Sequence, residues 1–223
     1  MTPRRIAAVV FDMDGTLIDS ESIYRAALVQ AMEALGRTVD EAFLHAITGL
    51  PGPEITLRIR ARYGEDFPFA AFHRHYVARR DTLAGDGIPL RPGAAEALRF
   101  VAGLGLPIAL ATSSMRASAL GHLRRLEILA HFTAVVTRDD VVRSKPHPDL
   151  FLKAAALLGV APADCLAVED SVAGVTAALA AGMMTVMVPD LVMPDAEMRR
   201  ACVAVHGSLH ELPLLFPPED GAA

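Results

Sequence analysis

The sequence is poor in several residue types, and each scarcity limits what the protein can be. Tryptophan is absent, and the only two cysteines, Cys165 and Cys202, are too few for a disulfide framework or a cysteine zinc site. Cys165 lies in an apolar run and is expected to be a buried thiol. Lys and Arg form no long run and the formal net charge is −5, so we do not expect nucleic acid as a partner.

Segments suited to export or membrane insertion are also missing. Arg4 and Arg5 precede only six apolar residues, too few for the apolar part of a signal peptide. Residues 172–189 carry no charge, but Gly182 divides them into an Ala-rich helical part and a short strand. We therefore expect a cytoplasmic protein that has no membrane partner. We also expect it to be a monomer.

Apolar residues make up 52% of the chain, and their pattern predicts an α/β fold. The uninterrupted run at 6–11 is typical of a strand buried on both faces of a parallel sheet. From residue 89 onward, helices and short apolar strands alternate, which predicts a doubly wound parallel sheet. The expected strands are 6–11, 107–111, 134–137, 166–168 and 185–188, and the expected helices among them are 93–104, 115–126, 148–158 and 172–181.

Residues 20–85 show no strand-like alternation and are expected to be helical throughout. Because this block interrupts the alternating pattern just after the first strand, it predicts an inserted α-helical domain. The expected core then consists of residues 1–19 and 86–223. The expected helices of the insert are 20–35, 40–47, 53–63 and 68–84, and Gly36 is a natural stop for the first of them.

Two further segments are expected to be flexible. Gly85, Asp86 and Gly87 close the insert and predict a hinge, because glycine leaves the backbone free to rotate. Residues 217–223 are expected to form a disordered tail.

Two acidic residues stand at the end of the first strand. Asp12 and Asp14 are two residues apart, so both point the same way on a pleated segment, and Gly15 allows a sharp turn after them. Open α/β sheets bind their ligands at the carboxyl ends of the strands. The stretch therefore predicts a pair of functional carboxylates at that edge.

Polar residues follow three later strands as well, and in a parallel sheet they would meet the two aspartates at the same edge. They are Thr112 and Ser113, Ser144 and Lys145, and Glu169 and Asp170. Four carboxylates in one place repel one another, by about 4 kcal/mol for each pair of charges ~4 Å apart at an effective dielectric near ~20. A hard divalent cation that prefers oxygen ligands, Mg²⁺, would relieve this repulsion.

The combination of Mg²⁺, a lysine, a hydroxyl and backbone N–H groups suits a phosphoryl group. Lys145 is one of only two lysines in the chain, and Thr112 and Ser113 stand just before an expected helix, where a hydroxyl and amides are available. Met13 is a further candidate phosphate-binding residue.

The two aspartates offer a two-step chemistry on that phosphoryl group. The Asp12 carboxylate can attack phosphorus to give an aspartyl-phosphate. Asp14 can protonate the leaving oxygen and then deprotonate the attacking water. This exchange of acid for base is what a two-step hydrolysis requires.

Four segments of the chain resemble, in order, the signature motifs of the haloacid dehalogenase-like superfamily, and the helical insert resembles its α-helical cap. The segments are 12–16, 112–113, 145–149 and 168–171, and the likeness extends to about Pro189. The resemblance implies that Asp12 is the nucleophile, that Asp14 is the acid/base, and that Thr112, Ser113 and Lys145 hold the phosphoryl group.

The same resemblance implies a metal site and a backbone feature. The Asp12 side chain, the Asp14 carbonyl and the Asp170 side chain would bind Mg²⁺, with Glu169 binding it directly or through water. The Lys145–Pro146 bond would be cis.

Within the superfamily, the motifs favour a phosphatase acting on a small organic phosphomonoester such as a sugar phosphate. Dehalogenases lack the second aspartate of the first motif, and phosphonate hydrolases use a cap lysine, whereas residues 20–85 contain no lysine. β-Phosphoglucomutases use a cap histidine and a cap arginine at positions that here match Tyr24 and Gly52. A phosphosugar mutase of that kind and a non-catalytic protein that binds a phosphate ligand remain alternatives.

Substrate choice is expected to depend on the insert. The candidate residues facing the site are Tyr24, Arg25, His45, Thr48, Arg58 and Arg62. Arg58 and Arg62 are four residues apart on one helix, so a solvated face explains this pair better than contact with a substrate does.

Overall fold

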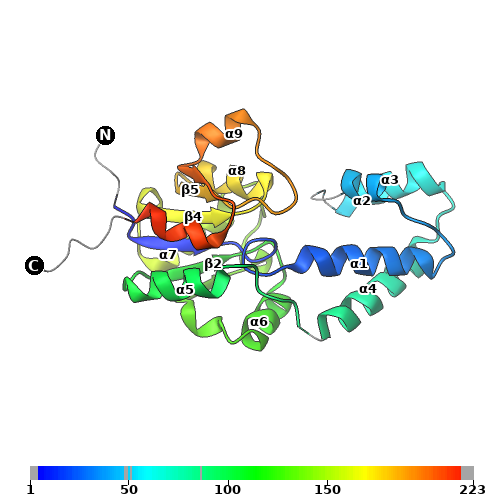
Figure 1. Cartoon of the computed structure of the whole chain (residues 1–223), viewed down its shortest axis with the longest axis horizontal. Coiled ribbons are helices and arrows are strands. Elements are labelled where there is room, and N and C mark those ends of the chain that lie inside the picture. The colour runs from blue at the N-terminus through cyan, green and yellow to red at the C-terminus, as the bar shows by residue number, and fades with distance from the viewer. Residues whose placement is uncertain (1–4, 48–49, 51, 86, 217–223) are drawn as a thin grey trace, which may run out of the picture. The chain divides into compact units, whose positions relative to one another are not determined.

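A computed structural model describes residues 5–47, 50, 52–85 and 87–216. The chain divides into two compact units (Figure 1), which we call the core unit (Met1–Asp19 and Pro89–Ala223) and the helical unit (Ser20–Ile88). The chain leaves the core unit after its first strand and returns to it at Pro89. Thr48, Asp86 and the expected tail lie outside the described residues.

In the described part of the core unit, six strands form one sheet in the order β3-β2-β1-β4-β5-β6, and every pairing is parallel. The strand order reverses at β1, since β2 and β3 extend the sheet on one side and β4 to β6 on the other. The carboxyl ends of β1 and β4 therefore lie where open α/β sheets bind ligands. The strands are β1 (Ala8–Phe11), β2 (Ile108–Ala111), β3 (Ala134–Val136), β4 (Cys165–Glu169), β5 (Met184–Met187) and β6 (Ala204–Val205).

Both faces of this sheet are covered, as the burial of alternate β1 residues shows. Ala8 and Val10 belong to an apolar cluster that includes residues of α7, whereas Val9 and Phe11 point to the opposite face and are equally buried. The predicted fold class, a doubly wound parallel sheet interrupted by a helical domain, is confirmed. The α-helices of the core unit are α5 (Ala94–Gly103), α6 (Arg116–Arg125), α7 (Asp149–Leu158), α8 (Val172–Ala180) and α9 (Ala196–Ala201).

The core unit continues beyond the last strand expected from the sequence. After β5 come α9, β6 and the 3₁₀ segment η4 (Leu209–Leu215). A strand of two residues is too short to produce an alternating pattern, which is why the sequence gives no sign of β6. The N–H of His206 nonetheless donates to Met187 O at 2.9 Å, and the pairing adds an edge strand to the sheet.

The helical unit consists of α1 (Ser20–Glu33), α2 (Glu41–Ile47), α3 (Gly52–Tyr63) and α4 (Phe69–Gly85) and has an apolar core of its own. α1 packs along α4, and the two helices lie side by side in Figure 1. Within the described residues, no helix has both the length and the apolar character that spanning a bilayer requires. Gly85 is the last residue of α4, whereas Gly87 has a positive φ of 95°.

Candidate active site

The carboxyl end of β1 turns sharply after Asp12. The N–H of Asp12 donates to Val168 O at 3.0 Å, which keeps Asp12 aligned with β4. Gly15 follows with a φ of 83°, and a Cβ atom at this position would lie 2.4 Å from Asp170 Oδ2. A side chain at residue 15 would therefore be strained and would collide with the end of β4. Thr16 Oγ1 holds the other oxygen of Asp170 at 2.9 Å.

Glu169 ends β4 and is completely buried at the start of α8. Its Oε2 accepts hydrogen bonds from the N–H groups of Asp170 (3.0 Å) and Ser171 (3.1 Å) and from the Ser171 hydroxyl (3.1 Å). Gly174, in the first turn of α8, leaves the necessary room, because a Cβ atom there would lie 1.8 Å from Glu169 Oε1. These donors and the helix N-terminus stabilise a carboxylate that is shielded from water.

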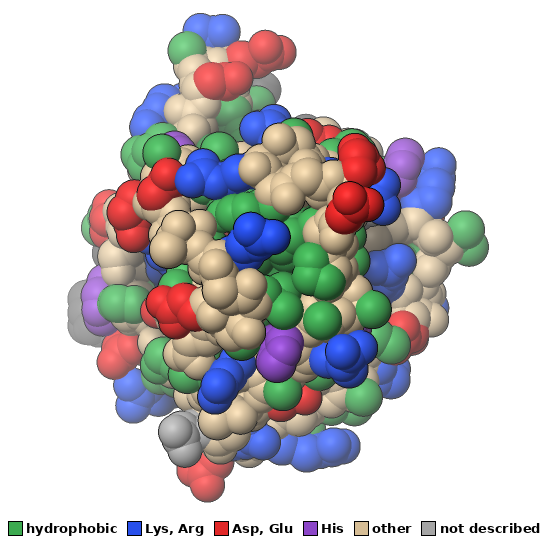
Figure 2. All heavy atoms as spheres, turned by 90° about the vertical axis from the view of Figure 1, so that its right-hand side faces the viewer, with side chains coloured by type: hydrophobic (Ala, Val, Ile, Leu, Met, Phe, Trp, Pro, Cys, Tyr) green, Lys and Arg blue, Asp and Glu red, His purple; other side chains and the backbone are tan. Residues whose placement is uncertain are grey.

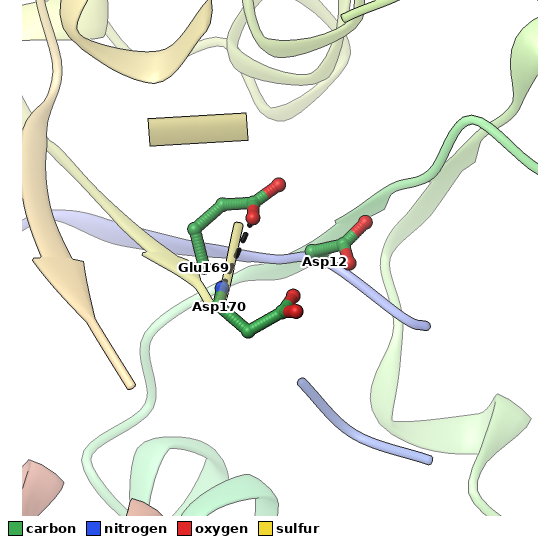
Figure 3. Close-up of side chains that lie close together, drawn as sticks. All are labelled: Asp12, Glu169 and Asp170. Atoms are coloured by element: carbon green, nitrogen blue, oxygen red, sulfur yellow. Dashed lines mark hydrogen bonds between the residues drawn. The ribbon is translucent and has the colours of Figure 1, made fainter. Parts of the chain in front are cut away.

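Asp12, Glu169 and Asp170 form a candidate metal site. One carboxylate oxygen from each lies within 4.8 Å of the others, and Figure 3 shows Asp12 coming from the end of β1 and the two neighbouring acids from the end of β4. The converging oxygens are a donor set that fits a hard divalent cation such as Mg²⁺. The carboxylate of Asp14 lies toward the loop after β2 instead.

The electrostatics of this cluster agree with a site built for a cation. Burial raises the pKa of Asp12 to about 7, because the charge of Lys145 offsets only part of the burial and of the repulsion from Glu169 and Asp14. Burial and the same crowding of like charges raise the pKa of Asp170 well above its usual value. A cation among these oxygens would favour their ionised forms.

Lys145 bridges two of the three carboxylates. Its ammonium group contacts Asp12 Oδ1 and Glu169 Oε1, and its side chain is only 7% exposed. Burial alone would lower the pKa of Lys145, but the two carboxylates outweigh it and raise the pKa above the ordinary value. The amine therefore stays charged. The Lys145–Pro146 bond is cis, as the sequence resemblance implied.

The loop after β2 presents three hydroxyl groups to this edge of the sheet. Thr112 is buried, and its Oγ1 lies 3.4 Å from Asp14 Oδ2, while Ser114 Oγ donates to the same oxygen at 2.6 Å. Ser144 Oγ donates to Ser113 Oγ at 2.8 Å and so ties this loop to the residue before Lys145. Sequence reasoning missed Ser114, since nothing in the sequence distinguishes it from its neighbour.

Met13 can contribute only through its main chain. Its side chain is fully buried, and its carbonyl accepts from the N–H groups of Leu17 and Ile18 at 2.9 and 3.0 Å. The other predicted site residues stand at the ends of β1, β2 and β4 and in the loop before α7, the locations that a parallel sheet predicts for them.

Three arginines proposed to face a substrate make ion pairs within the helical unit. Arg25 pairs with Glu41, Arg58 pairs with Glu54, and Arg62 pairs with Asp40 while lying over the rings of Phe43 and Tyr63. Each of these arginines therefore has an acidic partner on the surface of the helical unit. On the face drawn in Figure 2, Lys and Arg side chains are interspersed with Asp and Glu.

Comparison with known proteins places this geometry in a family. A family model for haloacid dehalogenase-like hydrolases matches residues 6–182, and the chain belongs to that family. The family and the hydrolase class predicted from the four motifs are therefore confirmed.

Individual relatives cover almost the whole chain. Hexitol phosphatase B of Escherichia coli K12 is 36% identical over 201 residues, which cover 88% of each chain. The crystal structure of a haloacid dehalogenase family hydrolase from Deinococcus radiodurans R1, with bound phosphate and sodium, matches with a TM-score of 0.78 and 31% identity over 94% of each chain. A β-phosphoglucomutase structure from Clostridium difficile matches with a TM-score of 0.71 and 26% identity over 93% of each chain.

Proposed function

We propose that the protein is a Mg²⁺-dependent phosphatase that hydrolyses a small organic phosphomonoester, such as a sugar phosphate, through an aspartyl-phosphate on Asp12. The observation that carries this proposal is the convergence of the buried Asp12, Lys145 and Glu169 side chains with the half-buried Asp170, and Asp14 lies two residues beyond the nucleophile. The hexitol phosphatase relative supports a phosphorylated polyol or sugar as the class of substrate.

The first step uses Asp12 and Asp14 together. A carboxylate oxygen of Asp12 attacks phosphorus, a new phosphorus–oxygen bond forms, and the bond to the leaving oxygen breaks. Asp14 donates its proton to that oxygen, so the alcohol leaves neutral. Lys145, buried and charged beside the nucleophile, stabilises the negative charge on the phosphoryl oxygens.

The second step reverses the role of Asp14. It accepts a proton from water, the water oxygen attacks phosphorus, and the bond to Asp12 breaks, which returns the free enzyme and inorganic phosphate. Thr112 and the amides of its loop are proposed to hold the phosphoryl oxygens in both steps, together with the main chain of Met13.

The proposed cation would be held by Asp12 and Asp170, by the carbonyl of Asp14, and by Glu169 directly or through water. When bound, Mg²⁺ supplies charge neutralisation and Lewis acidity to the phosphoryl group. Glu169 already gives one oxygen to backbone donors and the other to Lys145. These contacts favour the water-mediated role for this residue.

The surroundings of the site favour a substrate with one phosphoryl group. Arg116 and Arg143 lie close in sequence to site residues, but they pair with Asp140 at 2.8 Å and Asp149 at 2.9 Å. Lys145 pairs with carboxylates as well, but one of them is the proposed nucleophile Asp12, so among these three cations it is the one placed beside the reacting phosphoryl group. The β-phosphoglucomutases use a cap histidine and a cap arginine where this chain has Tyr24 and Gly52. Together with the arginine pairs, this difference favours a phosphatase over an enzyme that uses a sugar bisphosphate.

The helical unit is proposed to act as the cap that selects the substrate. Tyr24, Arg25, His45, Arg58 and Arg62 stay the described candidates for substrate contacts. His45 is exposed, and each of the three arginines pairs with an acidic residue of the helical unit. A cytoplasmic location and a monomeric state stay predictions.

Turnover of p-nitrophenyl phosphate tests the proposed chemistry. We expect phosphate release that requires Mg²⁺ and is lost on chelation, and we expect Asp12→Asn to lower kcat at least ~100-fold, since it removes the nucleophile. A wild-type protein without metal-dependent turnover would contradict the proposal, as would an Asn variant of equal activity.

The substrate and the mutase alternative need a second experiment. A panel of phosphorylated sugars, polyols and nucleosides, ranked by kcat/KM, identifies the substrate class. Interconversion of hexose phosphates in the presence of a sugar bisphosphate would identify a mutase instead. Release of inorganic phosphate without interconversion is the result that we expect.

A further inference from the structure

We propose that Ser114 is a positioning residue for Asp14, whose orientation it fixes by holding one carboxylate oxygen. The inference rests on the proposed function, in which Asp14 exchanges a proton with the leaving oxygen and with water. Neither the signature motifs nor the relatives' names assign a role to this serine. Its contact joins the ends of β1 and β2, which lie 100 residues apart in the sequence.

The geometry separates Ser114 from the other hydroxyl nearby. Ser114 Oγ donates to Asp14 Oδ2 at 2.6 Å, a length typical of a strong hydrogen bond from a hydroxyl to a carboxylate. Thr112 Oγ1 lies 3.4 Å from the same oxygen, which is long for such a bond, and it accepts from the Ser114 N–H at 3.0 Å. Thr112 thus supports the loop, and Ser114 makes the closer contact with the carboxylate.

Ser114 can act in this way because its own main chain is anchored to the neighbouring strand. The Arg138 N–H, in the 3₁₀ turn η2 (Arg138–Asp140) after β3, donates to Ser114 O at 3.1 Å. Arg116 reinforces the link, since its N–H donates to Asp139 at 2.9 Å and its guanidinium group contacts both oxygens of Asp140 at 2.8 and 2.9 Å. The hydroxyl is therefore presented from a fixed loop.

Fixing one oxygen of Asp14 matters because the two proton transfers need a carboxyl group in hydrogen-bond reach of the reacting oxygens. Without the serine hydroxyl, the side chain of Asp14 gains rotational freedom and spends less time in the reactive orientation. The loss should be larger for substrates whose leaving oxygen depends strongly on protonation. An alkyl phosphate is such a substrate, whereas p-nitrophenolate leaves readily without a proton.

The test compares these two kinds of leaving group. For Ser114→Ala, we expect kcat/KM to fall about 10-fold with the best alkyl phosphomonoester and no more than about 2-fold with p-nitrophenyl phosphate. Ser114→Thr keeps the hydroxyl and should restore most of the alkyl phosphate activity. Ser118→Ala is the matched control, because Ser118 is exposed on α6 and its hydroxyl lies 3.2 Å from Nε2 of the His122 ring instead of a site residue.

A second comparison asks whether Ser114 works through Asp14. In an Asp14→Ala background, Ser114→Ala should change kcat/KM no further, since the group that it positions is gone. Three results would each overturn the inference. They are an equal loss of kcat/KM with both substrates, an undiminished loss in the Asp14→Ala background, and failure of Ser114→Thr to restore activity. If the wild type turns over and Asp12→Asn does not, any of these results removes the role of Ser114 and leaves the proposed function standing. Absence of wild-type turnover removes both.

Discussion

Replacing Gly174 with alanine should displace the Glu169 carboxylate from its buried position. The added Cβ would lie 1.8 Å from Oε1 and 2.2 Å from Oε2, whereas Cβ atoms in proteins essentially never come closer than 3.0 Å to such a neighbour. A flexible side chain could retreat at little cost, but Glu169 is 0% exposed and is held by the main chain of Asp170, by Ser171 and by Lys145. The clash therefore cannot be relieved without breaking these contacts.

The size of the effect follows from what must be given up. Overpacking a filled interior costs about 1–3 kcal/mol. Each hydrogen bond lost by a charged acceptor adds roughly 1.5–3 kcal/mol. We expect the Gly174→Ala variant to lose at least about 3 kcal/mol of unfolding free energy. For a chain of this size that corresponds to a fall in Tm of roughly 6–12 °C.

Thermal and urea unfolding of the variant beside a matched control measure this loss. Gly121 lies inside α6, and a Cβ atom there would meet nothing within 4 Å. Gly121→Ala should therefore raise the stability by up to about 1 kcal/mol, because alanine favours the helix. A Gly174→Ala variant as stable as the wild type, or stabilised like the control, would refute the reasoning about the room left for Glu169.

Three other variants test the remaining parts of the structure. Lys145→Met removes the buried cation between two carboxylates and should cost about 3–5 kcal/mol of unfolding free energy, as broken buried ion pairs do. A loss of less than ~1 kcal/mol in urea unfolding would mean that the contacts of Lys145 with the two carboxylates are not desolvated. Mg²⁺ at about 100 times its Kd should stabilise the wild type by roughly 2.7 kcal/mol, and Asp170→Asn should abolish the increase in Tm; an unchanged response to Mg²⁺ would exclude Asp170 as a ligand. Burial alone would raise the pKa of Asp140, but hydrogen bonds from Arg116 and Thr137 lower it to about 2. Because the pKa of Asp140 in the folded protein lies below its ordinary value of 3.8, the stabilisation is present above pH ~4 and is lost as the pH falls toward ~2. The stability difference between the wild type and Asp140→Asn, discounted to roughly 1 kcal/mol for partial exposure, should therefore shrink over this range, and a difference that does not change with pH would contradict the assignment.

Sequence patterns predicted the alternating elements well, because each is long enough to show a period. The expected helices at 93–104 and 115–126, for example, appear as Ala94–Gly103 and Arg116–Arg125. The hydrophobic pattern did not predict the elements after β5, where β6 has two residues and the closing segment is a 3₁₀ helix. Neither kind of element leaves a periodic trace.

The helical unit shows a second limit of sequence reasoning. Arg62 stands four residues after Arg58 and could have faced either solvent or a substrate. Its partner Asp40 lies 22 residues earlier, and its guanidinium group covers the ring of Phe43. Since ion pairs between segments depend on how the helices pack, spacing on one helix could not reveal this role.

The sequence by itself determined the family, the doubly wound sheet and the residue types at its ligand edge. Strand-end motifs are local, so Asp12, Asp14, Lys145 and Asp170 can be recognised without knowing what they touch. Only the tertiary structure decided which partner each of these groups contacts. Lys145 contacts Asp12 and Glu169, Gly174 makes room for Glu169, and Ser114 holds Asp14. The physical reason is that burial, charge pairing and close contact arise between residues that only the folded chain brings together.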